Sequence, residues 1–279
     1  MKKNKIKDTG LEVTELSFGT SSLGSMPDTY GYEVPEQRAQ ETLKRFFQGP
    51  VNMLDTSRNY AMGESEKRIG IAIKENGGWP ENFILSTKID RNMETLVLDK
   101  KRTRESIEES LKTLNVDSVD ILFLHDPEYV KDVNDVTKKD GALDELFKIK
   151  EEGLAKAVGL AMGKINIMFP LLKNWDFDVI INHNRYTLLN READEMYSYA
   201  HSKNISIFNA APYAGGVLAK GPSNFKKITY QDVTEEKLAP AREIEKVCKK
   251  HNVEMGAAAL QFSMKDKRIT STLCGVTSI

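Results

Sequence analysis

Four side chains suited to proton transfer at a reacting oxygen lie at or just after the ends of three successive apolar runs. Asp55 ends "VNMLD", Lys88 ends "FILSTK" and His125 ends "VDILFLH". Tyr60 follows Asp55 in the segment "DTSRNYAMG". A carboxylate, an ammonium, an imidazole and a phenol can together orient an oxygen and move a proton to or from it. These residue types predict proton transfer coupled to hydride exchange, provided that the three runs end at one place.

The four groups have distinct expected roles. A free phenol has a pKa near ~10, too high for ready proton exchange at neutral pH. We expect the Lys88 ammonium to lower the pKa of Tyr60, because a nearby positive charge favours the phenolate. Asp55 is expected to pair with Lys88 and keep it charged, and neutral His125 to hydrogen-bond and orient the substrate oxygen. Tyr60 is thereby predicted to be the proton shuttle.

Each of these residues alone also has a purely structural interpretation. An Asp that closes a strand commonly caps a turn or a helix. A strand-end Lys is commonly solvated, and a His beside an apolar run is commonly a hydrogen-bonded structural residue. The coincidence of four such residues at successive strand ends favours the catalytic interpretation.

The elements that must position these side chains are short apolar runs separated by helical segments. The eight runs are "LSFG" from Leu16, "VNMLD" from Val51, "FILSTK" from Phe83, "VDILFLH" from Val119, "AVGLA" from Ala157, "DVIIN" from Asp178, "ISIFNAA" from Ile205 and "STLCG" from Ser271. Helical spacing relates apolar residues between them, as in Ile107, Leu111 and Leu114, in Leu143, Leu146 and Ile149, and in Ile244, Val247 and Cys248. Strands and helices are therefore predicted to alternate.

This alternation predicts a (β/α)8 TIM barrel of the α/β class. Continuous apolar runs are typical of parallel strands that helices cover, and a barrel of eight strand–helix units spans roughly 250 residues. The alternative is an open doubly wound sheet, which in a dinucleotide enzyme carries G-x-G-x-x-G after its first strand. The segment "GTSSLGS" at residues 19–25 lacks that spacing. Since the active site of a TIM barrel lies where the strands end, the four candidate residues are predicted to share one mouth.

Domain organisation is expected to be simple. No linker or low-complexity tract divides the chain, so we expect one domain over residues 1–279. The segment "KIKDTGLEVTEL" predicts a β-hairpin ahead of the barrel, with Thr9 and Gly10 in its turn.

Composition excludes several classes of partner. The 279 residues carry 40 Lys and Arg against 41 Asp and Glu, a net charge of −1 that argues against nucleic-acid and membrane surfaces. Lysines near the N-terminus are not followed by the apolar core of a signal peptide. The two cysteines lack metal-ligand spacing. We therefore expect a cytoplasmic protein, monomeric or homo-oligomeric, without metal, nucleic acid or membrane as partner, acting on a small carbonyl or sugar molecule.

The sequence resembles the aldo-keto reductase superfamily. "LDTSRNYAMGESEKRIG" is similar to the signature D-T-x-x-x-Y-G-x-x-x-S-E-x-x-x-G of these NAD(P)(H)-dependent barrel oxidoreductases, while "STK" and "VDILFLH" match its lysine and histidine motifs. The matching signature positions are Asp55, Tyr60, Ser65, Glu66 and Gly70. The resemblance implies a catalytic tetrad of Asp55, Tyr60, Lys88 and His125.

Within the superfamily, "LHDPE" and "NRYTLLN" are similar to the aldose 1-dehydrogenase branch, which includes D-threo-aldose, L-fucose and L-galactose dehydrogenases. Asp126 stands where many aldehyde reductases of the superfamily have an aromatic residue. A carboxylate there can accept hydrogen bonds from vicinal sugar hydroxyls, which makes Asp126 a candidate substrate-binding residue. Its alternative role is to cap the turn before Pro127.

The resemblance implies NADP or NAD as cofactor. The implied cofactor-binding residues are Gly19, Thr20, His183, Tyr213, Gly215, Gly216, Leu218 and Gly275. Tyr213 would stack on the nicotinamide, and the glycines would let the backbone approach the pyrophosphate. Two departures are evident. Ala161 and Met162 stand where the family often has Ser-Asn, and His183 stands where an amide-bearing Gln is common.

The end of the sequence also departs from the family pattern. The family continues beyond the segment corresponding to "STLCGVTSI", so the resemblance implies that the last barrel helix is missing here. We expect an enzyme that oxidises an aldose at C1 to the lactone. The alternatives are an NADPH-dependent aldehyde or ketone reductase, a non-catalytic cofactor-sensing subunit, and a truncated barrel with little or no activity.

Overall fold

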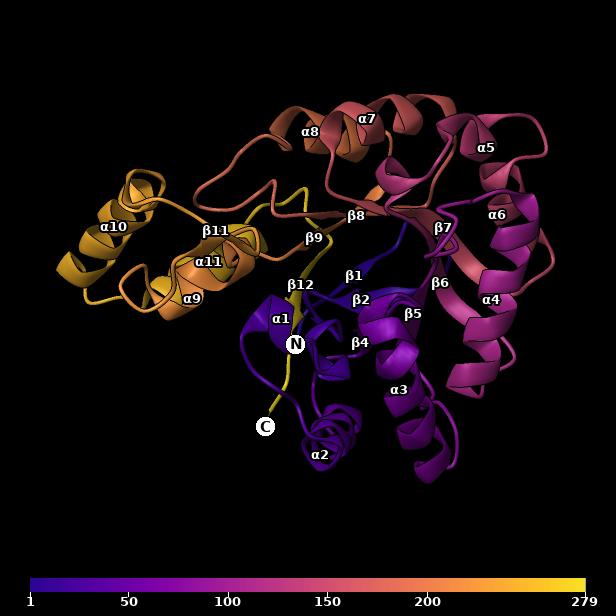
Figure 1. The fold of residues 1–279 in the computed structure, drawn as a ribbon, viewed down its shortest axis with the longest axis horizontal. Coiled ribbons are helices and arrows are strands. Elements are labelled where there is room, and N and C mark those ends of the chain that lie inside the picture. Colours follow the sequence, from indigo (N-terminus) through magenta and orange to yellow (C-terminus); the bar gives the residue numbers. More distant parts are fainter. Residues whose placement is uncertain (279) are drawn as a thin grey trace.

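The computed structural model describes residues 1–278, and its centre is a closed barrel of parallel strands (Figure 1). In chain order the barrel strands are β3 (Leu16–Gly19), β4 (Met53–Asp55), β5 (Ile84–Ile89), β6 (Val119–His125), β7 (Ala155–Met162), β8 (Val179–His183), β9 (Ser206–Ala210) and β12 (Ser271–Gly275). β12 closes the barrel by pairing with β3 on one side and β9 on the other. The predicted (β/α)8 barrel is confirmed, and each strand forms within or beside a predicted apolar run.

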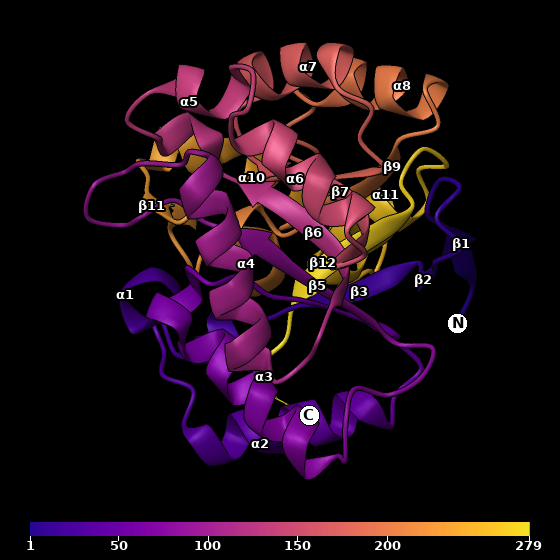
Figure 2. The ribbon, with the colours of Figure 1, turned by 90° about the vertical axis from the view of Figure 1, so that its right-hand side faces the viewer.

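Helices, most of them amphipathic, cover the outside of the barrel. They are α2 (Glu36–Phe47), α3 (Glu64–Glu75), α4 (Lys100–Leu114), α6 (Ala142–Glu151), α7 (Ile165–Asn174), α8 (Asp194–Ser202) and α11 (Met255–Met264). Figure 2 shows α3, α4 and α6 side by side against the strands. The outer core lies between the two layers, where Ile107, Leu114 and Leu143 are fully buried. No helix follows β12 within residues 1–278.

A hairpin closes the N-terminal end of the barrel. β1 (Lys3–Lys5) pairs with β2 (Glu12–Thr14) in antiparallel register, and Gly10 adopts a positive φ of 78° in the turn, as the sequence predicts. The buried side chains of Ile6 and Val13 pack against the apolar residues inside the barrel. This leaves the other end of the barrel, where the strands finish, for the site.

The excursion between β9 and α11 contains elements that the sequence analysis did not predict. They are the 3₁₀ turn η4 (Ala214–Gly216), α9 (Val217–Lys220) and the hairpin strands β10 (Lys227–Ile228) and β11 (Gln231–Asp232). The long helix α10 (Glu235–Lys250) of the same excursion contains the helical segment predicted at residues 244–248. In Figure 1 α10 stands to the side of the barrel. Cys248 of α10 is buried, but Val247 is 58% exposed, so the predicted apolar face of this segment is wrong at Val247.

Short turns lie in the loops at the ends of the strands. They are η1 (Ser22–Gly24), α1 (Pro27–Tyr30), η2 (Tyr60–Gly63), η3 (Pro127–Tyr129) and α5 (Val133–Thr137). Three of them, η1, α1 and η2, contribute side chains or backbone to the cavity described below, as does η4. None of the helices in the described part of the chain is long and apolar enough to cross a membrane.

Candidate active site

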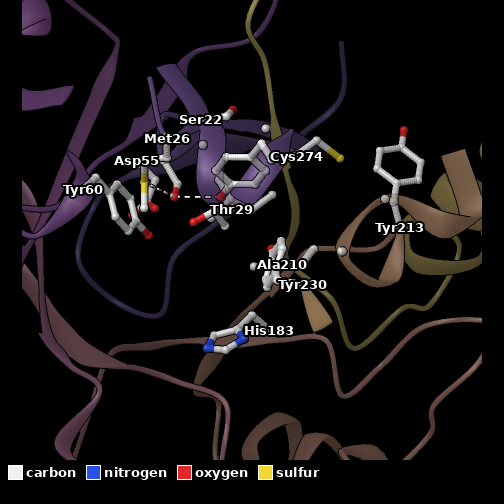
Figure 3. Close-up of a pocket in the computed structure, with 18 of the residues that line it drawn as sticks. Ser22, Met26, Thr29, Asp55, Tyr60, His183, Ala210, Tyr213, Tyr230 and Cys274 are labelled. Atoms are coloured by element: carbon white, nitrogen blue, oxygen red, sulfur yellow. Dashed lines mark hydrogen bonds between the residues drawn. The ribbon is translucent and has the colours of Figure 1, made fainter. Parts of the chain in front are cut away.

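A cavity of ≈ 460 Å³ lies at the C-terminal ends of the barrel strands (Figure 3). All four members of the predicted tetrad line it, namely Asp55, Tyr60, Lys88 and His125. They converge because each parallel strand of a closed barrel delivers its last residues to the same end. The structure therefore brings together residues that are up to 70 positions apart in the sequence.

Asp55 and Lys88 form a buried ion pair at the floor of the cavity. Lys88 Nζ lies 2.7 Å from Asp55 Oδ2, and both side chains are 1% exposed. The ammonium also donates to the carbonyl oxygen of Thr56 at 2.6 Å, and Ser86 Oγ donates to Asp55 Oδ1 at 2.7 Å. Ser86 and Lys88 lie on the same side of β5, since residues two apart in a strand share a face. The pair is thus charged, satisfied and fixed in position.

Tyr60 contacts this pair through the face of its ring. Lys88 Nζ lies 4.5 Å from the centroid of the ring. The ammonium donates its hydrogen bonds to Asp55 Oδ2 and to the carbonyl oxygen of Thr56. Desolvation, followed by the negative charge of Asp55, raises the pKa of Tyr60 well above its usual range. The predicted lowering of this pKa is wrong for the structure, because burial of the phenol and the nearby Asp55 carboxylate both disfavour the phenolate. Tyr60 is therefore a protonated phenol here.

The turn that carries Tyr60 has an unusual backbone. Ala61 and Met62 adopt φ values of 50° and 53°, the left-handed region that costs most L-residues roughly 1–2 kcal/mol. Gly24 makes room for this turn, since a Cβ at Gly24 would lie 2.6 Å from the Cβ of Ala61. Two consecutive residues in this conformation bend the chain sharply before Gly63 and leave the Tyr60 side chain at the cavity wall.

His125 is held by a carboxylate that the sequence analysis missed. Its Nδ1 lies 2.6 Å from Oδ1 of Asp90, which follows β5 and is 2% exposed. Burial alone would lower the pKa of His125, but the carboxylates of Asp126 and Asp90 outweigh burial and raise it. These neighbours favour the imidazolium over the neutral imidazole that the sequence analysis expected. Alternation along "KID" could have revealed Asp90, because Lys88 and Asp90 lie on the same side of the chain.

Asp126 reaches the cavity from a left-handed backbone position, with φ 45° and ψ 51°. Oδ2 lies 3.7 Å from His125 Nε2, and Oδ1 lies 3.8 Å from Nε2 of His183. Burial raises the pKa of Asp126, but the two histidines outweigh it and bring the pKa to about 2. Oδ1 is buried and accepts no hydrogen bond from the described residues. Asp126 therefore offers an ionised acceptor that a ligand in the cavity can use.

The predicted cofactor residues divide into two groups. Six line the cavity, namely Gly19, His183, Tyr213, Gly215, Gly216 and Gly275. Thr20 and Leu218 do not. The Thr20 hydroxyl is buried and donates to the carbonyl oxygen of Asp55 at 3.0 Å, and Leu218 is fully buried among apolar residues beside α10 and α11. The structure gives these two residues a packing role.

Residues 15–279 match the Aldo/keto reductase family. The chain belongs to this family. It is 31% identical over 284 residues to L-galactose dehydrogenase of Arabidopsis thaliana, covering 98% of this chain and 83% of the relative. It is 26% identical over 292 residues to D-threo-aldose 1-dehydrogenase of a Pseudomonas species, covering 95% and 86%. These are similarities in sequence over most of each protein.

Solved structures confirm the fold of this aldo-keto reductase. The holo form of an aldo-keto reductase from Bacillus halodurans superposes with a TM-score of 0.78 at 23% identity, covering 100% of this chain and 87% of the other. A glycerol dehydrogenase from Gluconobacter oxydans gives a TM-score of 0.74 at 20% identity, covering 99% and 86%. At these identities the likeness concerns the barrel fold alone.

The family generally uses NAD(P)H, and the lining of the cavity fits such a group. Gly19 and Gly275 end the neighbouring strands β3 and β12. A Cβ at either position would have no protein atom nearer than 3.4 Å, so the glycines expose their backbone to the cavity without being required for packing. Gly215 and Gly216 have φ values of 78° and 122°, which favour glycine. Lys220 adds a cation to the lining. When bound, the nicotinamide supplies the donor or acceptor of hydride.

Aromatic residues at the mouth complete the site and were not predicted. The rings of Tyr30 and Tyr230 meet edge to face, with centroids 5.7 Å apart, and Tyr30 Oη donates to Ser21 Oγ at 2.8 Å. Tyr230 comes from the hairpin turn between β10 and β11 (Figure 3). The contact joins loops that are 200 residues apart in the sequence, so no local pattern could have indicated it.

Proposed function

We propose that this aldo-keto reductase oxidises an aldose at C1 to the lactone, with NAD or NADP as hydride acceptor and Tyr60 as the proton shuttle. The observation that carries the proposal is the ionised Asp126 carboxylate beside His125, with one buried oxygen that accepts no hydrogen bond from the described residues. A sugar hydroxyl next to the reacting carbon can donate to that oxygen. The names of the two dehydrogenase relatives agree with such a substrate.

The residues of the cavity have defined roles in this reaction. In the oxidation Tyr60 must first lose its own phenol proton to solvent, and the resulting phenolate then takes the C1 hydroxyl proton. The hydride that leaves C1 as the C1–O double bond forms would be accepted by the bound nicotinamide. Asp126 and His125 fix the sugar so that C1 and its hydrogen keep one orientation. The buried Lys88–Asp55 pair places the Lys88 ammonium 4.5 Å from the centroid of the Tyr60 ring and so helps to fix the position of the phenol.

A second candidate is the reverse reaction, in which the protein reduces an aldehyde or ketone with NADPH. The raised pKa of Tyr60 favours this alternative, because a protonated phenol is ready to donate to a carbonyl oxygen. Both candidates use the same residues. They differ in the substrate that the cavity binds best.

The test compares both directions with one preparation. Oxidation of L-galactose, L-fucose and a D-threo-aldose is measured with NAD+ and NADP+, and reduction of a simple unhydroxylated aldehyde with NADH and NADPH. The proposal expects the higher kcat/KM for an aldose and expects Asp126→Asn to reduce that value more than the value for the simple aldehyde. A higher kcat/KM for the simple aldehyde would support the reductase instead.

A cytoplasmic location is part of the proposal. Both cysteines, Cys248 and Cys274, are buried free thiols. Thiols persist in the reducing cytosol, whereas secreted proteins commonly form disulfides.

A further inference from the structure

The imidazole of His125 lies between two carboxylates, one at each ring nitrogen. Nδ1 is 2.6 Å from Asp90 Oδ1, and Nε2 is 3.7 Å from Asp126 Oδ2. A neutral imidazole has one N–H donor and one acceptor nitrogen, whereas an imidazolium has two donors. Nδ1 also lies 3.3 Å from Ser57 Oγ, and its hydrogen bond to Asp90 makes it the donor nitrogen. Nε2 is then an acceptor in the neutral ring and a donor in the imidazolium, and the nearby Asp126 carboxylate favours the donor.

Both oxygens of the Asp90 carboxylate accept hydrogen bonds or face a donor. Its Oδ2 accepts hydrogen bonds from Ser57 Oγ at 2.6 Å and from the backbone N–H of Asn59 at 3.0 Å, while its Oδ1 faces His125. Arg102 donates to the backbone carbonyl of Asp90 instead of to its carboxylate. In residues 1–278 no lysine or arginine forms an ion pair with this carboxylate. A buried anion without a cation is costly, so a charged His125 is the compensating group.

We propose that Asp90 is a positioning residue that holds His125 as a doubly protonated imidazolium, with its Nε2–H directed at the reacting oxygen as a charged hydrogen-bond donor. The inference rests on the proposed function for the identity of that oxygen, and it deepens the role of the same site. His125 neither gains nor loses a proton during the reaction. The hydroxyl proton still goes to Tyr60 in its phenolate form, and the hydride with its electron pair would be accepted by the oxidised nicotinamide.

A charged donor at this place stabilises the oxygen as negative charge develops on it. Hydrogen bonds with an ionised partner are roughly twice as strong as neutral ones. Loss of one such donor to a developing oxyanion commonly costs about 10²–10³-fold in kcat. The arrangement serves both directions, because the same oxygen gains negative charge as its proton leaves in oxidation and as hydride arrives in reduction.

Groups from several elements determine how His125 titrates. Asp90, after β5, and Asp126, after β6, favour the imidazolium, while burial and the Lys88 ammonium oppose it. Tyr60 from η2 meets the ring edge to face with centroids 5.8 Å apart and remains uncharged. His183 from β8 lies on the far side of Asp126. The two carboxylates outweigh the opposing effects, so the pKa of His125 is raised.

The test is an NMR titration of the whole protein labelled with ¹⁵N-histidine, without substrate. The sequence has four histidines, and His125→Gln assigns the signal. We expect both ring nitrogens of His125 to be protonated at pH 7, and Asp90→Asn to shift the titration downward by at least about one pH unit. Asp178→Asn is the matched control, since Asp178 is a buried, lysine-paired carboxylate at the opposite end of the barrel, before β8. It should leave the titration unchanged.

A ring with one protonated nitrogen at pH 7, or an unchanged titration in Asp90→Asn, would overturn the inference. These outcomes do not depend on any substrate, so they are distinct from a failure of the proposed function. For any substrate that is turned over, the loss of kcat at high pH should begin at a lower pH in Asp90→Asn than in the wild type. If the role of Asp90 were merely structural, Asp90→Asn would lower the stability of the protein without shifting the pH at which kcat falls.

Discussion

Tyr60 is the residue on which the proposed chemistry depends most directly. Its phenol is the group whose proton exchange the mechanism requires, and its ring is fixed between Lys88 and His125. Removing the hydroxyl leaves both contacts of the ring in place. The chemical and structural contributions of Tyr60 can therefore be separated.

We expect Tyr60→Phe to lower kcat by at least ~100-fold, the range for losing a proton-transfer group, while NAD(P)H binding stays within a few-fold. Steady-state kinetics and a cofactor titration measure the two effects. Tyr129→Phe is the control, since that ring is 51% exposed and lies outside the cavity. Near-normal turnover in Tyr60→Phe would rule out the shuttle role.

At the residue scale, the sequence predicted which tetrad side chains meet but not their charge states. Convergence follows from the order of strands in a barrel, which the apolar runs indicate. The pKa of Tyr60 and that of His125 depend on neighbours such as Asp90, whose distance from the rings no sequence pattern gives. Thr20 shows the same limit, because its hydroxyl faces the Asp55 backbone rather than the cavity.

Helix α3 shows how one element supports the site through its packing. It follows directly after the turn that carries Tyr60, and it contains Glu66 and Gly70 of the signature that the sequence analysis identified. Both residues are fully or nearly fully buried in the interior of the protein. Gly70 packs against α4, and Glu66 accepts a hydrogen bond from Thr87 of β5.

Gly70 allows α3 and α4 to approach closely. A Cβ at Gly70 would lie 2.1 Å from the backbone oxygen of Thr113, so Gly70→Ala must push the helices apart. We expect Gly70→Ala to lower the free energy of unfolding in urea by about 1–3 kcal/mol. Gly256→Ala in α11 is the control, because its nearest protein atoms would be 3.6 Å away. Equal stability of the two variants would contradict this account of α3.

Glu66 makes the packing of α3 against β5 sensitive to pH. Its Oε1 accepts from Thr87 Oγ1 at 2.5 Å, its Oε2 accepts no described hydrogen bond, and burial raises its pKa from 4.5 to about 7. Folding therefore favours the protonated acid. This stabilisation is complete below pH 4.5 and is lost as the pH rises through 7.

We expect Glu66→Gln to match the wild type near pH 5 and to be more stable at pH 8, by on the order of 2–3 kcal/mol. Urea unfolding at the two pH values measures this difference. Glu75→Gln serves as the control, since that side chain ends the same helix and is 50% exposed. A difference that does not grow between pH 5 and pH 8 would refute the assignment.

At the element scale, the regular strands and most helices could be predicted, whereas the β10–β11 hairpin could not. Predictable hairpins carry Asn-Gly or a similar pair at the turn. Here Thr229 and Tyr230 occupy the turn with φ values of 51° and 67°, which neither residue type favours. In this turn conformation Tyr230 contacts Tyr30, which lies 200 residues away in the sequence. The residues near Tyr230 in the sequence carry no pattern that predicts such a contact.

The whole molecule is a barrel that closes through β12. The strand pairs with both neighbours, and Leu273 and Cys274 on it are buried. None of the large exposed apolar side chains in residues 1–278 lies on β3 or β12. Leu16 and Phe18 of β3 are partly buried against the outer core.

A closed barrel with a glycine-lined cavity should bind the dinucleotide. We expect saturable binding of NADH, NADPH or both in a fluorescence titration, and the tighter of the two identifies the preferred cofactor. Lys220→Met should weaken binding roughly fivefold, about 1 kcal/mol, because it removes a cation from the cavity wall. Lys203→Met is the control, since that exposed lysine lies beyond α8 and outside the cavity. Failure of folded protein to bind either cofactor would contradict the fit of this cavity.

The central claim is that hydride leaves C1 of an aldose and arrives on the nicotinamide. The most direct measurement follows deuterium from L-galactose labelled at C1 into the reduced cofactor, with mass spectrometry of both products. The account predicts that deuterium appears in the nicotinamide ring and that the sugar is recovered as the lactone, in equal amounts. Folded, cofactor-binding protein that transfers no deuterium from this or any other C1-labelled aldose would contradict it.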